Sequence, residues 1–200
     1  MTVIKHKEQR VGVFIDTQNL YHTAKNLYHA RVNFGAVLKD IVAGRDIVRA
    51  IAYVITTESG DEKAFFDALT KMGIETKTKD LQIFAGGSKK ADWDVGLAVD
   101  AIKLSSKLDA VVIVSGDGDF IPLVEYLKMN GCQVEAASFG KSTSMKLKEA
   151  VDEFIDLDEN PRKYLLGSQG YAPRPARGGS RTPTDNSDLD AMLKDAGEML

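Results

Sequence analysis

Two aspartates lie close together directly after a strongly apolar run in the middle of the chain. Val111 to Val114 are four consecutive β-branched residues, a pattern typical of a strand buried on both faces of a parallel sheet. Asp117 and Asp119 follow with only Gly118 between them, and glycine places no side chain in the way of the two carboxylates. Two such charges at the end of a strand cost free energy unless a cation offsets them. The spacing therefore predicts a divalent metal site.

A similar arrangement occurs near the start of the chain. The apolar run 11–15 ends in Asp16, and residues with helical spacing follow directly, with Asn19 in the first turn. Open α/β sheets place their ligands at the carboxyl ends of their strands. We therefore expect the strand at 11–15 to lie beside the strand at 110–114, which brings Asp16 close to the other two acids. Asn19 would suit the orientation of a phosphate or a metal-bound water.

A third acidic segment opens the predicted helix 92–104, where Asp92 and Asp94 fall near the first turn. Aspartate is a usual ligand of magnesium and manganese, and in metal-assisted hydrolysis a bound ion lowers the pKa of a water while a second ion stabilises the leaving oxygen. Asp92 is a spare ligand in this scheme. The predicted catalytic residues are Asp16, Asp94, Asp117, Asp119 and Asn19, and the four aspartates are also the predicted metal ligands.

Each acid taken alone has a simpler explanation. An aspartate before a helix is often an N-cap, acids in a first turn are favoured by the helix dipole, and Asp100 in mid-helix is expected to be solvated or paired. His22 and His29 share a helix face but lack a third zinc ligand. Cys132 is expected to be a buried free thiol, and Trp93 to serve packing. The convergence of three segments on one edge favours the metal site.

Strand and helix patterns alternate along the chain with almost no tight hairpins, which predicts an α/β fold: a doubly wound, mostly parallel sheet flanked by helices. The segment 74–79 alternates as an edge strand would, and 86–90 is expected to be a basic loop. The other predicted strands are 11–15, 46–55, 110–114, 133–139 and 154–157, and the predicted helices are 20–28, 34–42, 61 to the stop at Gly73, 92–104, 120–129 and 141–151.

Composition bounds the organisation of the protein. The 200 residues, 44% of them hydrophobic, suit one folded domain, predicted over 11–166 after a polar lead-in at 1–10. Residues 167–200 are expected to form a disordered Gly/Pro/Arg-rich tail. Within it, residues 187–198 could either form a short helix that docks on a protein partner or share the disorder of the tail. The net charge of −3 leaves nucleic-acid contacts to local patches. No membrane-spanning run or signal peptide is recognisable, so a cytoplasmic location without membrane contact is expected.

Three segments of the chain resemble motifs of a known family. Over roughly residues 10–158 the chain resembles the NYN domain family, in its LabA-like branch. The segments are Phe14-Ile-Asp-Thr-Gln-Asn-Leu20, Lys89-Lys-Ala-Asp-Trp-Asp-Val-Gly-Leu-Ala-Val-Asp-Ala101 and Val114-Ser-Gly-Asp-Gly-Asp-Phe120. The resemblance implies a PIN-like, Rossmann-like three-layer nuclease fold and a Mg²⁺- or Mn²⁺-dependent ribonuclease site, with Asp16, Asp94, Asp117 and Asp119 as metal ligands and Asn19 as their polar companion.

The middle motif departs from the family pattern, which usually has a Lys-Gly-x-Asp-Val style element. Here Ala91-Asp92-Trp93 precedes Asp94, so it stays open whether Asp92 also reaches the metal.

Single-stranded RNA is the expected partner of a ribonuclease. Such an enzyme needs cations to hold the nucleic-acid backbone. Lys89, Lys90 and Lys141 are the predicted nucleic-acid-binding residues, with Lys77 and Lys79 nearby, and Arg174, Arg177 and Arg181 could add flexible contacts from the tail. Cleavage within the strand is favoured over cleavage from an end. A homodimer is compatible with the sequence.

Two other functions stay open. LabA-like proteins are also associated with regulatory roles, so the chain could bind RNA and metal without turnover and recruit a partner through its tail. A phosphatase of the haloacid dehalogenase type is disfavoured, because that chemistry needs Asp-x-Asp after the first strand and Asp16-Thr-Gln-Asn19 does not supply it.

Overall fold

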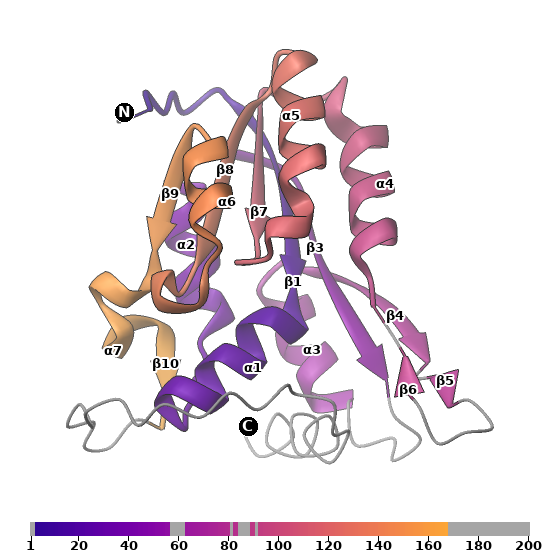
Figure 1. Ribbon diagram of the computed structural model, residues 1–200, viewed down its shortest axis with the longest axis vertical. Helices are drawn as coiled ribbons and strands as arrows, with labels where there is room; N and C mark the ends of the chain where they lie inside the picture. The colour runs from indigo at the N-terminus through magenta and orange to yellow at the C-terminus, as the bar shows by residue number, and fades with distance from the viewer. Residues whose placement is uncertain (1–2, 57–62, 81, 84–88, 91, 168–200) are drawn as a thin grey trace.

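The computed structural model describes residues 3–56, 63–80, 82–83, 89–90 and 92–167 (Figure 1). For the pairs 82–83 and 89–90 it describes the backbone alone. Six strands form one sheet in the order β4-β3-β1-β7-β8-β9, and all neighbouring strands are parallel. The strands are β1 (Arg10–Asp16), β3 (Asp46–Thr56), β4 (Glu75–Asp80), β7 (Ala110–Val114), β8 (Gln133–Ser138) and β9 (Glu153–Asp156). The predicted α/β fold class is confirmed, with β4 as the predicted edge strand.

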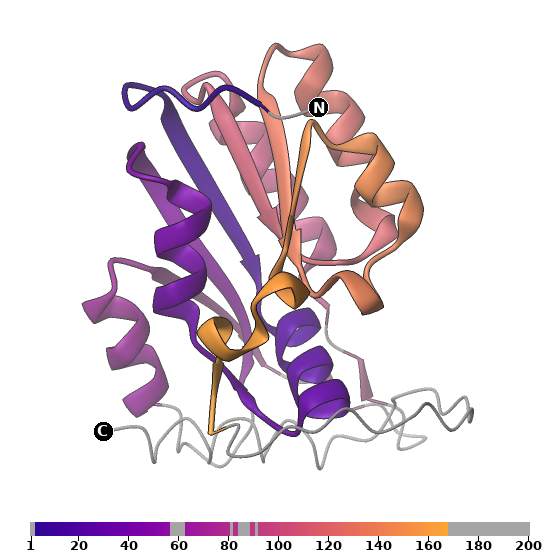
Figure 2. The same ribbon diagram turned by 90° about the vertical axis from the view of Figure 1, so that its left-hand side faces the viewer.

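Helices cover both faces of the sheet, and Figure 2 shows the sheet between the two helical layers. The core on one face includes α1 (Thr17–Tyr28), α2 (Phe34–Val42) and α3 (Lys63–Lys71), and the core on the other includes α4 (Asp94–Ser105), α5 (Ile121–Met129) and α6 (Met145–Ala150). Side chains of β1 alternate between the two cores: Val13 and Ile15 pack in the first, and Phe14 packs in the second. The domain is therefore a three-layer sandwich.

The strand order reverses between β1 and β7. From β1 the chain passes outward to β3 and β4, then returns through α4 to β7 on the other side of β1 and continues to β8 and β9. Ile15 pairs with Val114 at the carboxyl ends of the two strands, so they are neighbours as predicted. The helices that follow β1 and β7 cover opposite faces, which leaves a crevice between the strand ends where α/β proteins bind ligands.

Local sequence explains where several elements begin and end. Asp16 caps α1, and Asn33 caps α2 by accepting a hydrogen bond from the Ala36 backbone N–H. After α2 the backbone turns left-handed at Ala43 and at Gly44, whose φ is 76°, which agrees with the predicted stop at Gly44. The predicted helix from residue 141 is shorter than expected, because a 3-10 turn, η2 (Gly140–Ser142), precedes α6.

Several short elements were not predicted. β2 (Arg31–Val32) pairs with β10 (Leu165–Leu166), and β5 (Gln82–Ile83) pairs with β6 (Lys89–Lys90), both antiparallel. The prediction of a loop at 86–90 is therefore wrong at Lys89 and Lys90, because a two-residue strand has no periodicity to read. The remaining short elements are η1 (Gly118–Phe120), η3 (Leu157–Glu159) and α7 (Pro161–Tyr164).

The polar lead-in packs against the sheet through ion pairs. Lys5 bridges Glu135 on β8 and Glu153 on β9 at 3.2 and 2.6 Å. Glu135 also forms a fully buried pair with Arg45, which links the start of β3 to β8. The predicted tail beyond Gly167, with its helix at 187–198, lies outside the described residues. Among the helices of the described residues, none has the length and hydrophobicity required to cross a membrane.

Candidate functional site

Asp16 connects the carboxyl ends of the two central strands. One carboxylate oxygen accepts a hydrogen bond from the Asn19 backbone N–H, and the other accepts one from the Ser115 hydroxyl, both at 3.1 Å. Burial raises the pKa of Asp16 to about 6; the two hydrogen bonds oppose this rise, while the charges of Asp94 and Asp117 add to it. Asp16 is thus an N-cap, and it also lies within electrostatic reach of the other predicted ligands.

The loop after β7 positions the paired acids of the third motif, Asp117 and Asp119. Asp117 accepts a hydrogen bond from the Asp119 backbone N–H at 2.9 Å and so caps η1. Its own backbone N–H donates to the Ser115 hydroxyl at 3.3 Å. Asp117 is half-buried, whereas Asp119 is exposed. The two acids therefore differ in setting although they are two residues apart.

Asn19 joins the first helix to the β7 loop. Its side-chain oxygen accepts a hydrogen bond from the Gly116 backbone N–H at 2.9 Å. The predicted role in orienting a phosphate or a water would fall to its NH₂ group, which has no hydrogen-bond partner among the described residues. In this structure Asn19 fixes the distance between the Asp16 and Asp117 segments.

Asp94 reaches the same edge from a third segment, and Trp93 holds that segment in place. The indole N–H of Trp93 donates to the Val54 carbonyl at 3.0 Å, and the ring packs on Tyr53 with 5.4 Å between ring centres. Trp93 is therefore a packing residue, as expected. Burial raises the pKa of Asp94, and the charges of Asp92, Asp117 and Asp119 raise it further.

The donor atoms of the site are of the chemical type that a hard divalent cation prefers. All candidate donors are carboxylates, whose oxygens suit Mg²⁺ and Mn²⁺. Burial raises the pKa of Asp16 and of Asp94, and repulsion from neighbouring carboxylates raises both further. A cation at this position would offset that repulsion. As the side chains stand, the described residues hold no group of three His, Cys, Asp or Glu able to ligate one ion.

Glycine is required in this loop by the packing of the next one. A Cβ atom at Gly116 would lie 2.9 Å from the hydroxyls of both Ser138 and Thr143, and one at Gly118 would lie 2.8 Å from the Ser144 hydroxyl. The Ser144 N–H also donates to the Gly116 carbonyl at 3.0 Å. Gly118 thus does more than leave space between two acids: it admits the segment after β8.

Sequence reasoning missed these supporting hydroxyls. Ser115, Ser138 and Thr143 are all buried, and Ser115 contacts two of the predicted site segments. The position of Ser115, directly after a buried strand and before the acids, was the available signal.

The predicted RNA-binding lysines differ from one another in the groups that they contact. Lys77 pairs with Asp100 at 2.6 Å, which confirms that Asp100 is a paired charge. The Lys141 ammonium donates to the Tyr28 hydroxyl at 3.0 Å, and its backbone N–H donates to Asp158. Lys89 and Lys90 lie in β6, and their side chains are outside the described residues.

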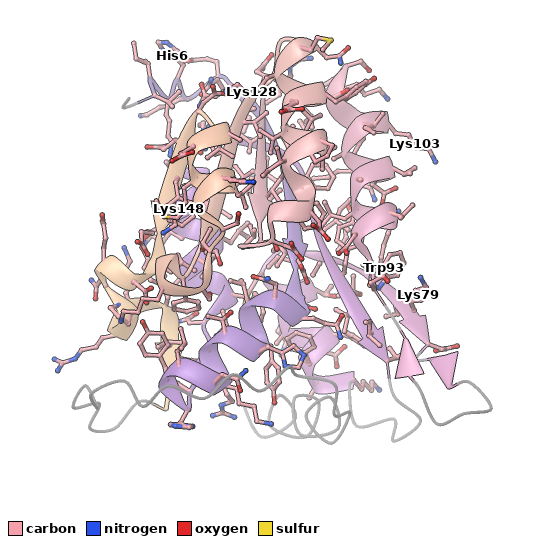
Figure 3. All side chains as sticks on the ribbon, viewed as in Figure 1. His6, Lys79, Trp93, Lys103, Lys128 and Lys148 are labelled. Carbon is pink, nitrogen blue, oxygen red and sulfur yellow. The ribbon has the colours of Figure 1, made fainter. Side chains whose placement is uncertain are left out.

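Of the predicted lysines whose side chains are described, Lys79 lies at the start of the acidic segment 92–94. Its ammonium donates to the Asp92 carbonyl at 3.1 Å and lies over the Trp93 ring, 5.7 Å from the ring centre. Figure 3 shows the two side chains together at the start of α4.

Cys132 is a buried free thiol, as predicted, and burial raises its pKa. A thiol with a raised pKa carries less thiolate at neutral pH, so it is a poor nucleophile.

Comparison with known proteins identifies the same family that the three sequence motifs resemble. Residues 10–158 match the model of the NYN domain family, a range that includes all three acidic segments. The chain is 26% identical to the low amplitude and bright protein LabA of Synechococcus elongatus, over 76% of this chain and 86% of LabA. It is also similar to the crystal structure of a protein of unknown function from Vibrio parahaemolyticus, with a TM-score of 0.73 and 29% identity, covering 82% of this chain and 100% of that one. The chain therefore belongs to the NYN domain family.

Proposed function

We propose that this protein is a metal-dependent ribonuclease that hydrolyses phosphodiester bonds within RNA, with Mg²⁺ or Mn²⁺ held by Asp16, Asp94, Asp117 and Asp119. The observation that carries the proposal is that acids from three separate segments converge where the strand order reverses between β1 and β7. Their charges add to burial in raising the pKa of Asp16 to about 6 and in raising that of Asp94. Acids that disfavour one another's ionised forms at a ligand-binding edge are a recurrent feature of functional sites.

The chain's own residues provide rigid positioning. The Ser115 hydroxyl and the Asn19 backbone N–H fix both oxygens of Asp16, so this carboxylate has a defined orientation. Asn19 ties the β7 loop to α1, which sets the spacing between Asp16 and Asp117. When bound, a divalent ion would lower the pKa of a water and stabilise developing negative charge on phosphate oxygens.

RNA as substrate is supported by cations near these acids. Lys79 lies beside Asp92 at the start of α4, and Lys141 keeps 60% of its side chain exposed despite its pairing with Asp158. Lys89 and Lys90 precede the middle acidic segment in the sequence. A cation beside the acids, with further lysines in neighbouring segments, would hold the strand by its phosphates without reading its sequence.

The test is cleavage of a 5′-labelled single-stranded RNA with Mg²⁺, Mn²⁺ or EDTA. We expect the wild-type protein to cut with metal and not with EDTA. Asp117→Asn should lose at least about 100-fold in rate, because even residues that only support a metal ligand cost 10–100-fold. Asp67→Asn, on the exposed side of α3, is the matched control and should cut at the wild-type rate. Equal rates in the two variants would contradict the proposed site.

A second candidate is binding of RNA without turnover. It is favoured by the arrangement of the side chains, because the described residues hold no group of three His, Cys, Asp or Glu able to ligate one ion. RNA that is retained with metal but stays intact with both ions would support this function over hydrolysis.

A further inference from the structure

A groove of about 430 Å³ runs between α4 and α5, which lie side by side in Figure 1. It begins at the candidate metal site, because Asp94 opens α4, Asp119 lies directly before α5, and both acids line it. Beyond them its walls are mostly apolar and extend along both helices as far as Ile102 and Tyr126. The groove is therefore continuous with the acids and has a different chemistry along most of its length.

Several apolar side chains of the groove are exposed to water. Val95 is 73% exposed, Tyr126 42% and Ile102 38%. Apolar and aromatic residues around a few placed polar groups are the usual lining of a small-molecule site, and the volume is in the range of such sites. A ligand of this groove needs a flat, apolar body joined to a group that the acids hold through a cation.

The tail of the chain is a poor occupant by charge. Its last segment has apolar positions at helical spacing, but Asp188, Asp190 and Asp195 accompany them. These carboxylates would meet Asp94 and Asp119 at the mouth of the groove, and like charges in contact are unfavourable. A nucleotide fits better, because its charge is confined to the phosphate at one end, while its base is flat and uncharged and suits the exposed apolar walls beyond the acids.

We propose that the α4/α5 groove is a base-binding subsite: it receives the base of a nucleotide whose phosphate lies at the candidate metal site. The inference rests on the proposed function and extends it to substrate selection. A base can enter only when it is unpaired and unstacked from its neighbours, so the groove selects single strands. Because the lining beyond the acids is almost wholly apolar, discrimination among bases is weak and a purine binds better than a pyrimidine through its larger ring surface.

The first test is a binding experiment that needs no turnover. Methyl-labelled protein is titrated with adenosine 5′-monophosphate and, separately, with ribose 5-phosphate, both with Mg²⁺. We expect the methyl resonances of Ile102 and Leu123 to shift with the nucleotide and to stay in place with the base-free sugar phosphate. Equal shifts with both ligands, or none with either, would overturn the inference.

Variants locate the subsite on the groove. Tyr126→Ala should weaken binding of adenosine 5′-monophosphate about tenfold, the usual scale for loss of a stacking ring, whereas Tyr126→Phe keeps the ring and should bind within about twofold of wild type. Ile102→Ser should also weaken binding. Val99→Ser is its matched control, because Val99 lies on the same helix, is 39% exposed and is absent from the lining.

The outcomes separate this inference from the proposed function. Groove shifts with nucleotide while RNA stays intact would support the subsite and refute hydrolysis. RNA cleavage at wild-type rates in both Tyr126→Ala and Ile102→Ser would overturn the subsite and leave hydrolysis standing. Methyl shifts that follow protein concentration rather than nucleotide would assign the groove to contact between two copies of the chain, and would also overturn it.

Discussion

The Ser115 hydroxyl donates a hydrogen bond to the Asp16 carboxylate at 3.1 Å, across 99 residues of sequence. This contact joins the carboxyl ends of β1 and β7 at the point where the strand order reverses. It holds one acid of the candidate site in place and lowers its pKa against the effect of burial. The same hydroxyl accepts the Asp117 backbone N–H, so one small side chain organises two of the three acidic segments.

Ser115→Ala is expected to destabilise the protein and to change the titration of Asp16. Removal of the hydroxyl leaves a buried carboxylate oxygen and a backbone N–H without their partner, a cost of about 1–3 kcal/mol in the free energy of unfolding. The pKa of Asp16 should rise further, because one of the interactions that lowers it is lost. Urea unfolding and a carboxyl NMR titration measure the two effects.

Ser105→Ala is the control for this change. Ser105 is also buried and donates a hydrogen bond to the Ile102 carbonyl, but it lies at the far end of α4. An unchanged Asp16 pKa in Ser115→Ala, or an equal shift in both variants, would contradict the assigned role.

Asp16 should make the metal-free protein less stable as the pH rises from about 4 to 6. Its ordinary pKa of 3.8 is raised to about 6 by folding, so between these values the folded state binds more protons than the unfolded state. The stabilising contribution is complete below pH 3.8 and is lost as the pH passes through 6. The shift corresponds to up to about 3 kcal/mol.

The measurement is urea unfolding from pH 4 to 7 with EDTA, for wild type and Asp16→Asn. Asparagine still caps the helix but does not titrate, so the variant should be the more stable protein at pH 7 and its stability should fall less across this range. A constant difference between the two proteins over the whole range would show that Asp16 does not titrate in it. Added Mg²⁺ should narrow the difference at pH 7 if the acids bind it.

Gly116→Ala should destabilise the protein, whereas Ser138→Ala should not. The new methyl group would lie 2.9 Å from the Ser138 and Thr143 hydroxyls and 3.2 Å from the Thr143 Cα, and overpacking of this kind costs about 1–3 kcal/mol. The Ser138 hydroxyl is fully buried and has no hydrogen-bond partner within the described residues. Its removal therefore costs little and can stabilise the fold.

Thermal unfolding of both single variants and of the double variant tests this packing. The double variant should recover part of the loss seen in Gly116→Ala, because one of the two hydroxyls that crowd the methyl group is gone. Strictly additive effects would show that Ser138 does not limit the space at Gly116.

Lys79→Ala should weaken RNA binding to a similar extent for unrelated sequences. The ammonium group lies beside the acids, where it would contact a phosphate, so the plot of log affinity against log salt should lose about one unit of slope. Lys77→Ala is the matched control on the same strand, because Lys77 is paired with Asp100. Fluorescence anisotropy with two unrelated single strands measures both; equal slopes in the two variants would argue against a phosphate contact at Lys79.

The sequence alone was sufficient to predict the fold class and the neighbouring positions of β1 and β7 in the sheet. Residues 110–114 form a wholly buried strand, which their apolar, largely β-branched composition indicates without any tertiary information. The regular alternation of strand and helix patterns implies parallel strands whose carboxyl ends meet at one edge, and the structure pairs Ile15 with Val114 there.

The tertiary structure alone decided how the side chains at that edge are held. The bond from Ser115 to Asp16 and the buried pair of Arg45 with Glu135 join residues 99 and 90 positions apart, and no local period encodes which polar groups meet after folding. Two-residue strands such as β6 are set by their partner rather than by their own pattern. Periodicity reports which face of a segment is buried, so it determines the layers of this protein, whereas hydrogen-bond partners depend on distances between segments that only the packed sheet fixes.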